Sequence, residues 1–243
     1  MKRLVKATPR RIMRRLRLAR GPDGEFPPDF GAEEIAIIRL VQPYTMTSPE
    51  RLFALIEAVR YVARNRIPGA VVECGVWKGG SMMAVAETLK RLGQLETDLY
   101  LYDTFRGMTD PGAEDVAYTG ESAADQFRPS WLAASLAQVE AALATIGYPA
   151  ARIHLVPGDV EETIPGSAPD VISLLRLDTD WYASTRHELV HLYPRLAPGG
   201  VLIVDDYGHW EGARRAVDEY VAENRIRLLL NRIDYTGRIA VKG

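Results

Sequence analysis

The spacing of apolar residues along the chain changes near residue 70. Before that point it is helical: residues 33–41 form a short amphipathic stretch, and a stronger one follows Ser48. Its apolar positions are Leu52, Leu55, Ile56, Val59 and Val62. Ser48 is a suitable N-cap and Pro49 suits the first helical position, so we predict a helix that begins at Pro49 and stops before Pro68-Gly69.

After residue 70, short apolar runs alternate with turns and amphipathic segments, a pattern typical of βαβ units in a parallel sheet. The predicted strands are residues 70–74, 99–103, 152–158, 171–178 and 200–206. The predicted helices after them are residues 80–92, 133–146, 184–193 and 211–223. Two further apolar runs flank Asp234–Gly237 and predict an antiparallel hairpin. The fold class is therefore α/β: a doubly wound, mostly parallel, Rossmann-like sheet of seven strands with a C-terminal hairpin.

Length and composition fit one domain. The chain has 243 residues, of which 47% are hydrophobic, enough for a full-sized core. We predict a basic arm and linker over residues 1–31 and a single domain over 32–243. No run of eighteen apolar residues and no signal-peptide core is present, and Cys74 is the single cysteine, so we expect a cytoplasmic protein without a membrane span.

The charge is distributed unevenly. Nine of the 30 Lys and Arg residues lie in the first twenty positions, which contain no acid, so 21 remain against 32 Asp and Glu. Such an arm could contact anionic lipid, nucleic acid or an acidic protein surface. We favour an arm that frays or packs on a partner chain, predict no nucleic-acid partner, and place no chemistry there.

Ligands of open α/β sheets bind beyond the carboxyl ends of the strands, and the first of these ends is rich in glycine. The residues concerned are Glu73, Gly75, Trp77, Gly79, Gly80 and Ser81. Their spacing is Glu-x-Gly-x-x-x-Gly-Gly, and it differs from the Gly-x-Gly-x-x-Gly of dinucleotide sites. S-adenosylmethionine has no pyrophosphate to bind and carries a cationic sulfonium, which a nearby carboxylate favours. We therefore predict S-adenosylmethionine at this turn, although any tight βα turn can contain such glycines.

The next two strand ends extend the predicted cofactor site. Asp103 ends the second run and can accept both ribose hydroxyls, with an N-cap or a solvated turn as the alternative. Gly158 and Asp159 end the third run, where adenine is approached in this architecture.

Acidic residues end the fourth and fifth runs. Asp178 and Asp180 follow one strand, and Asp205 and Asp206 follow its neighbour, so all four can converge above the sheet. Their mutual repulsion favours a bound cation, and Mg²⁺ prefers such oxygen ligands. We predict Asp178, Asp205 and Asp206 as metal ligands, with Asp178 also counted in the cofactor site. The alternatives are a solvated turn and an acidic loop, and Mn²⁺ or Ca²⁺ could replace Mg²⁺.

An acceptor hydroxyl near that metal needs a general base. Asp180 is the first candidate, and His209 is the second because histidine titrates near neutral pH.

These motifs together resemble the macrocin O-methyltransferase family, whose members methylate sugars and phenols of antibiotics. The resemblance covers about residues 44–225 and rests on four blocks. They are Tyr44-Thr45-Met46-Thr47, residues 68–80, Leu177-Asp178-Thr179-Asp180 with Tyr182, and residues 193–207. It implies a methyltransferase sheet, S-adenosylmethionine bound near Thr45, Met46 and Asp103, Mg²⁺ on the three acids, and Asp180 as base. It further implies a homo-oligomer.

The acceptor side departs from the family pattern, since Gly208-His209-Trp210 follows Asp206-Tyr207. We expect His209 and Trp210 to line the acceptor site, and residues 105–127, rich in Gly, Asp and Pro, to form a lid or an ordinary surface loop. The predicted partner is a small-molecule hydroxyl acceptor, such as a sugar diol or a catechol-like phenol. Two alternative hypotheses remain: an NAD-dependent oxidoreductase or nucleotide-sugar enzyme, and a degenerate methyltransferase fold that only binds a partner.

Overall fold

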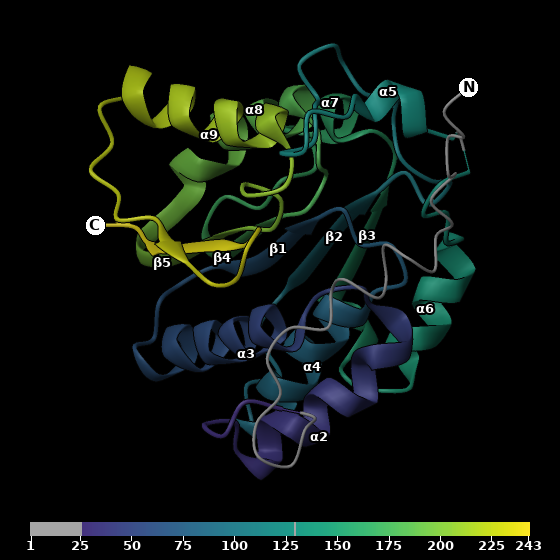
Figure 1. The fold of residues 1–243 in the computed structure, drawn as a ribbon. Coiled ribbons are helices and arrows are strands. Elements are labelled where there is room, and N and C mark those ends of the chain that lie inside the picture. Colours follow the sequence, from purple (N-terminus) through teal and green to yellow (C-terminus); the bar gives the residue numbers. More distant parts are fainter. Residues whose placement is uncertain (1–25, 129) are drawn as a thin grey trace.

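A seven-stranded sheet forms the centre of the computed structural model, which describes residues 26–128 and 130–243. The strand order is β3-β2-β1-β4-β5-β7-β6. The first five are parallel, and the terminal hairpin adds β7 and β6 antiparallel to β5, as predicted (Figure 1). Most of the predicted basic arm lies outside the described residues.

The strands fall close to the predicted ranges. They are β1 (Ala70–Cys74), β2 (Leu99–Asp103), β3 (Ile153–Pro157), β4 (Ile172–Leu177), β5 (Leu196–Val204), β6 (Asn231–Arg232) and β7 (Arg238–Val241). The prediction for β5 was wrong at its start: pairing begins at Leu196, opposite Ile172, and a register irregularity lets the strand continue through Pro198 and Gly199. Gly199 has a φ of +78°, which glycine tolerates without strain.

The longer helices are α2 (Ala32–Val41), α3 (Pro49–Arg64), α4 (Gly80–Arg91), α6 (Leu136–Ala144), α8 (Tyr182–Leu192) and α9 (Glu211–Glu223). Short helices not predicted are η1 (Gln42–Tyr44), α5 (Ala123–Gln126), η2 (Ala150–Arg152), α7 (Val160–Thr163) and η3 (Tyr193–Arg195). Ser48 caps α3 as predicted, since its hydroxyl accepts from the Arg51 N–H at 3.2 Å. Helix α6 starts three residues later than predicted because Ser135 and Gln138 form a capping box.

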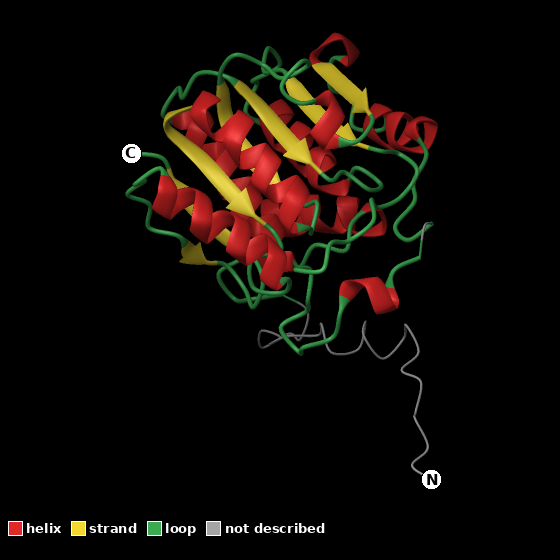
Figure 2. Ribbon diagram, turned by 90° about the horizontal axis from the view of Figure 1, so that it is seen from above, coloured by secondary structure: helices red, strands yellow, loops and turns green. Residues whose placement is uncertain are grey.

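The two faces of the sheet bury separate cores. Alternation along β1 turns Val71 toward α2, α3, α4 and α6, and turns Val72 toward α8 and α9. Figure 1 shows α2, α3 and α4 on one side of the strands and α8 and α9 on the other, and Figure 2 shows the helices covering the strands from above. The same alternation places Glu73 on the α3 face and Cys74 on the α8 face, which decides how the site is assembled.

Among the described residues, no helix is both long enough and apolar enough to cross a bilayer.

Candidate active site

The glycine turn after β1 brings the ends of two strands together. Gly75 and Gly79 have φ values of +83° and +86°, which side chains rarely adopt. A Cβ atom on Gly75 would overlap the backbone carbonyl of Asp178 at the end of β4. Glycine is therefore required at position 75 for both its conformation and its close approach to the acidic loop.

Asp103, at the end of β2, holds this turn in place. Its Oδ2 accepts from the backbone N–H groups of Val76 at 2.7 Å and Trp77 at 2.9 Å, and its Oδ1 accepts from Phe105 N–H at 2.7 Å. Burial raises the pKa of Asp103, and these three bonds oppose that rise. The Thr104 hydroxyl also lies 3.5 Å from Oδ1, so the protein itself takes up most of the acceptor capacity of this carboxylate, and a ribose contact at Asp103 stays a prediction.

The other predicted cofactor residues surround this turn. Gly80, at the start of α4, packs so closely on Tyr44 and Thr45 that a Cβ would clash with the Tyr44 carbonyl. Met46 is 51% exposed, whereas Ser81 is buried. These contacts bring the Tyr44–Met46 block and the glycine turn together, as a shared cofactor site requires.

The end of β3 is arranged differently. Gly158 has a φ of +139°, and Asp159 is the N-cap of α7, with its Oδ1 accepting from Glu161 N–H at 2.9 Å. Asp159 therefore performs a local structural role, and an adenine contact at this position stays a prediction.

The acids of β4 and β5 converge as the strand ends predicted. Asp178, Asp205 and Asp206 each offer one oxygen within 4.8 Å of the others, a separation that one metal ion can span. Asp180, with a φ of +69°, shares a hydrogen bond with Asp206 and receives another from the Trp210 indole. Burial and the neighbouring carboxylates raise the pKa of Asp180 to about 7 and that of Asp206 well above its ordinary value. A divalent cation would relieve this repulsion, so the donor set fits Mg²⁺.

Two buried arginines balance part of this charge. Arg176 of β4 pairs in register with Glu73 of β1, and the two side chains form an ion pair on the α3 face. Arg176 also donates to Asp178 at 2.6 Å and to Asp205 at 2.6 Å. Water cannot solvate either charge, because the Glu73 residue is 1% exposed and Arg176 is 2% exposed. Burial alone would lower the pKa of Arg176, but the surrounding carboxylates outweigh it and raise that pKa above its ordinary value. The guanidinium therefore stays charged.

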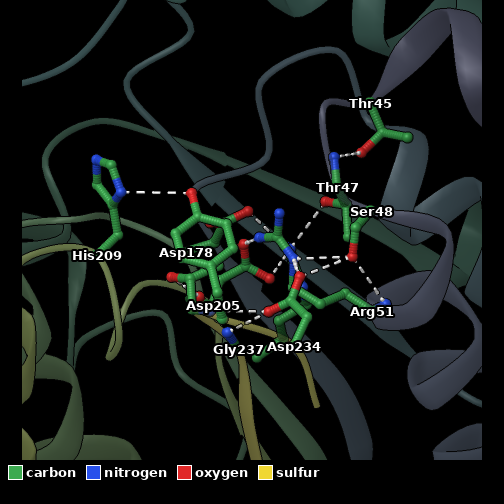
Figure 3. A network of polar contacts seen from close by, with 12 residues as sticks. Thr45, Thr47, Ser48, Arg51, Asp178, Asp205, His209, Asp234 and Gly237 are labelled. Carbon is green, nitrogen blue, oxygen red and sulfur yellow. Dashed lines mark hydrogen bonds and ion pairs between the residues drawn. The ribbon is translucent and has the colours of Figure 1, made fainter. Parts of the chain in front are cut away.

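The second arginine, Arg51, reaches the same acid from α3. It forms ion pairs with Asp205 and, at 3.1 Å, with Asp234 between β6 and β7. Asp234 in turn accepts from Ser48 at 2.8 Å and from Gly237 N–H at 2.7 Å. Figure 3 shows Arg51 and Asp234 beside Asp205. Both oxygens of Asp205 thus accept from arginine, which fixes the carboxylate in one orientation.

Sequence reasoning missed Arg51, Arg176 and Asp234. One signal was available for Arg176, because it is the only charge inside the apolar run 171–177, and Glu73 is the only charge inside 70–74. Buried charges need partners, so these two could have been paired in advance. Nothing local marks Arg51 or Asp234, which lie 183 positions apart.

Glu73 also provides a test of whether the cofactor fits. Its Oε1 is held by Arg176, whereas its Oε2 is buried without a hydrogen-bond partner. Burial raises the pKa of Glu73 to about 8, against the opposing charge of Arg176. An unpartnered carboxylate oxygen beside the glycine turn suits a cationic ligand, as S-adenosylmethionine is.

His209 lies on the opposite side of the acids from Thr45 (Figure 3). Its ring packs on Trp210, with 4.8 Å between ring centroids, and its Nδ1 lies 3.4 Å from the Tyr235 hydroxyl. Burial and then the charge of Arg51 lower its pKa, so the imidazole is neutral at pH 7. The predicted lid, residues 105–127, docks here through Tyr118 N–H, which donates to the His209 carbonyl at 2.8 Å.

Known proteins match both this fold and this chain. The model of the macrocin O-methyltransferase family matches residues 33–241. A tetracenomycin-C 4'-O-methyltransferase of Streptomyces olivaceus, whose substrate name includes a dimethoxy-rhamnosyl group, is 34% identical over 80% of this chain and 74% of its own. Demethyldecarbamoylnovobiocin O-methyltransferase of Streptomyces niveus is 33% identical over the same shares. The solved structure of the O-methyltransferase NovP superposes with a TM-score of 0.74 at 31% identity, covering 82% of each chain.

The fold and these relatives define an S-adenosylmethionine-dependent O-methyltransferase. Within that class, the chain belongs to the macrocin O-methyltransferase family. The resemblance inferred from the motifs is thereby confirmed, and the comparisons favour an enzyme of this class over the oxidoreductase and over a fold that only binds a partner.

Proposed function

We propose that this enzyme methylates a hydroxyl of a natural-product sugar or phenol with the assistance of Mg²⁺. The observation that carries the proposal is the convergence of Asp178, Asp205 and Asp206 next to the glycine turn. The relatives named above support the acceptor class, because they are O-methyltransferases of tetracenomycin and novobiocin compounds.

The residues of the site form two groups with different functions. The glycine turn, Glu73 and Asp103 hold the cofactor, which supplies the methyl group, with Thr45, Met46 and Ser81 beside them. Asp178, Asp205 and Asp206 hold the metal, which would make the acceptor hydroxyl more acidic. Arg51 and Arg176 keep Asp205 oriented through their ion pairs.

Asp180 is the proposed general base, accepting the proton that the acceptor hydroxyl loses. It lies two residues beyond Asp178 in a loop tied down by its bonds to Asp206 and Trp210. His209 is less suitable, because its half-buried ring packs against Trp210 and Tyr235 and because burial lowers its pKa. Residues 105–127 are the proposed lid, since they reach across to both α8 and α9 through Asp115 and Val116.

Calorimetry tests this proposal directly. S-adenosylhomocysteine should bind with and without Mg²⁺, and binding of Mg²⁺ itself should be lost in Asp206→Ala. Glu140→Ala, an exposed acid on α6, is the control and should leave both unchanged. Failure of S-adenosylhomocysteine to bind under any condition would contradict the cofactor assignment. Metal binding that persists in Asp206→Ala would contradict the metal site. The homo-oligomer stays a prediction that light scattering can check.

A further inference from the structure

Asp180 has a backbone conformation that its neighbours must stabilise. Its φ of +69° lies in the left-handed region, where a residue other than glycine is strained by roughly 1–3 kcal/mol. Such a conformation persists only where surrounding contacts impose it. One contact is local, since the Trp181 N–H donates to the Thr179 carbonyl at 2.8 Å. Further contacts on the two residues that follow Asp180 come from the proposed lid, residues 105–127.

Asp115 provides the first of these contacts. It is 1% exposed, and its Oδ1 accepts from the Tyr182 N–H at 2.8 Å. Tyr182 begins α8, and Trp181 at the N-cap position makes no side-chain cap of its own. Asp115 therefore acts as the cap of α8, where a carboxylate also suits the positive end of the helix dipole. The peptide group that Asp115 binds comes directly after Asp180.

Two tryptophans connect the proposed lid to Asp180. The Trp181 indole donates to the Thr109 carbonyl at 2.9 Å, and the Trp210 indole donates to Asp180. The two buried rings meet edge to face, with 5.1 Å between their centroids. Ala117 of the lid forms a backbone bridge with Trp210. Both the backbone and the side chain of Asp180 are therefore held by groups that contact the lid.

The start of α9 has room for the Asp115 carboxylate because residue 212 is glycine. A Cβ atom on Gly212 would overlap Asp115 Oδ1. Gly212 lies in the first turn of α9, a position where helices disfavour glycine relative to alanine. Beside it, the Glu211 N–H donates to the Val116 carbonyl at 2.8 Å, so the lid reaches the start of α9 as well as that of α8 (Figure 1).

We propose that Asp115 is a positioning residue for the methyl transfer, which holds the proposed base Asp180 beside the other acids by docking the lid on α8 and α9. The inference rests on the proposed function of Asp180. It makes docking of the lid and placement of the base a single event, so that Asp180 has its reacting conformation only while the lid is docked.

Hydrogen exchange of two tryptophan indole N–H groups, followed by NMR on the whole protein, tests this proposal. The Trp210 signal reports the bond to Asp180, and the Trp181 signal reports the bond to the lid carbonyl of Thr109. In Asp115→Ala, we expect the Trp210 N–H to exchange at least roughly tenfold faster, because local opening becomes easier. Asp115→Asn keeps one acceptor oxygen, so it should give an intermediate rate.

A second variant perturbs the same contact without removing the carboxylate. Gly212→Ala displaces Asp115 while placing a better helix former in α9, so it should accelerate Trp210 exchange as Asp115→Ala does. Asp110→Ala, at an exposed acid of the lid, is the control and should change the rate less than about twofold. In an Asp180→Ala background the Trp210 N–H has lost its acceptor, so adding Asp115→Ala should accelerate its exchange little further.

Two results would overturn the proposal. Faster exchange at Trp181 with unchanged exchange at Trp210 would show that Asp115 anchors the lid alone. Full acceleration by Asp115→Ala in the Asp180→Ala background would show that the effect does not act on Asp180. The Kd for S-adenosylhomocysteine should be the same in all variants, which shows that they are folded. Failure of S-adenosylhomocysteine to bind even the unaltered protein would contradict the proposed function instead, and indole exchange would still decide the role of Asp115.

Discussion

The two halves of the site are built from different kinds of contact. On the β1–β2 side, backbone geometry decides the arrangement: Gly75 and Gly79 adopt positive φ, and Asp103 binds backbone N–H groups. On the β4–β5 side, charged side chains decide it, because Arg51 and Arg176 bind Asp205 between them. The first half depends on residues close in sequence and the second on residues from both ends of the chain. Substitutions in the first half should therefore strain the backbone, whereas substitutions in the second half should leave buried charges without partners.

The largest effect is expected in the charged half, from Asp180→Asn. An amide cannot accept the proton of the acceptor hydroxyl, so kcat should fall by roughly 10²–10⁴-fold, the range for loss of a general base. The affinity for S-adenosylhomocysteine should change less than about twofold, since a base acts on the acceptor. Steady-state kinetics with an accepted substrate and calorimetry measure the two quantities. His209→Gln is the comparison: if it abolishes turnover and Asp180→Asn does not, the roles of the two residues are reversed.

Arg51→Met should cause the largest loss of stability. It leaves Asp205 and Asp234 buried without their cation, and the breaking of a buried pair costs about 3–5 kcal/mol. Urea unfolding measures this loss. Arg64→Met, on the same helix with a side chain 67% exposed, should cost less than about 1 kcal/mol.

A second variant distinguishes the loss of charge balance from the loss of packing. Adding Asp234→Asn to Arg51→Met removes one of the unpaired charges, so the double variant should be more stable than the sum of the single effects. Simple additivity would show that the pair does not interact in the folded protein.

Gly75→Ala probes the backbone half. The added Cβ meets a positive φ and the Asp178 carbonyl together, for an expected cost of roughly 2–4 kcal/mol. Cofactor affinity should fall as well, because the turn must move. Gly93→Ala is the matched control: its φ of +69° is also positive, but a Cβ there meets nothing within 4 Å, so only about 1–2 kcal/mol is expected. Equal losses in both variants would mean that the close approach at Gly75 has no role.

The difference between the halves also explains what the sequence could predict. The strand positions, the glycine turn and the acids at the ends of β4 and β5 follow from local patterns, and the structure brings the turn and the acids together. The Arg51–Asp234 ion pair could not be predicted in this way. An arginine on an amphipathic helix is usually exposed, and nothing in the neighbouring sequence indicates a partner 183 residues away. The start of β5 was missed because Pro198 and Gly199 are usual strand breakers, and tertiary pairing with β4 overrides them. Tyr118 and Tyr235 meet only through the folding of a loop and a hairpin onto one spot.

The smallest effect concerns the pH dependence of the hairpin. Burial alone would raise the pKa of Asp234, but the charge of Arg51 and the hydrogen bonds from Gly237 and Ser48 hold it below its ordinary value. A carboxyl whose pKa is lowered by folding stabilises the native state above its ordinary pKa near 3.8, and this contribution is lost as the pH falls through the lowered value. Asp234→Asn should therefore cost roughly 1 kcal/mol at pH 7, and the difference from the unaltered protein should shrink below about pH 4.

Urea unfolding at a series of pH values measures that difference, with Asp170→Asn at an exposed position as control. The control should show no such pH dependence. The difference in free energy of unfolding between Asp234→Asn and the unaltered protein could instead stay constant down to pH 3. That result would mean that packing and the hydrogen bonds of a neutral Asp234 stabilise the hairpin. The ion pair between Arg51 and Asp234 would then add nothing to the stability of the terminal hairpin. Arg51 would stabilise only Asp205 among its two acidic partners.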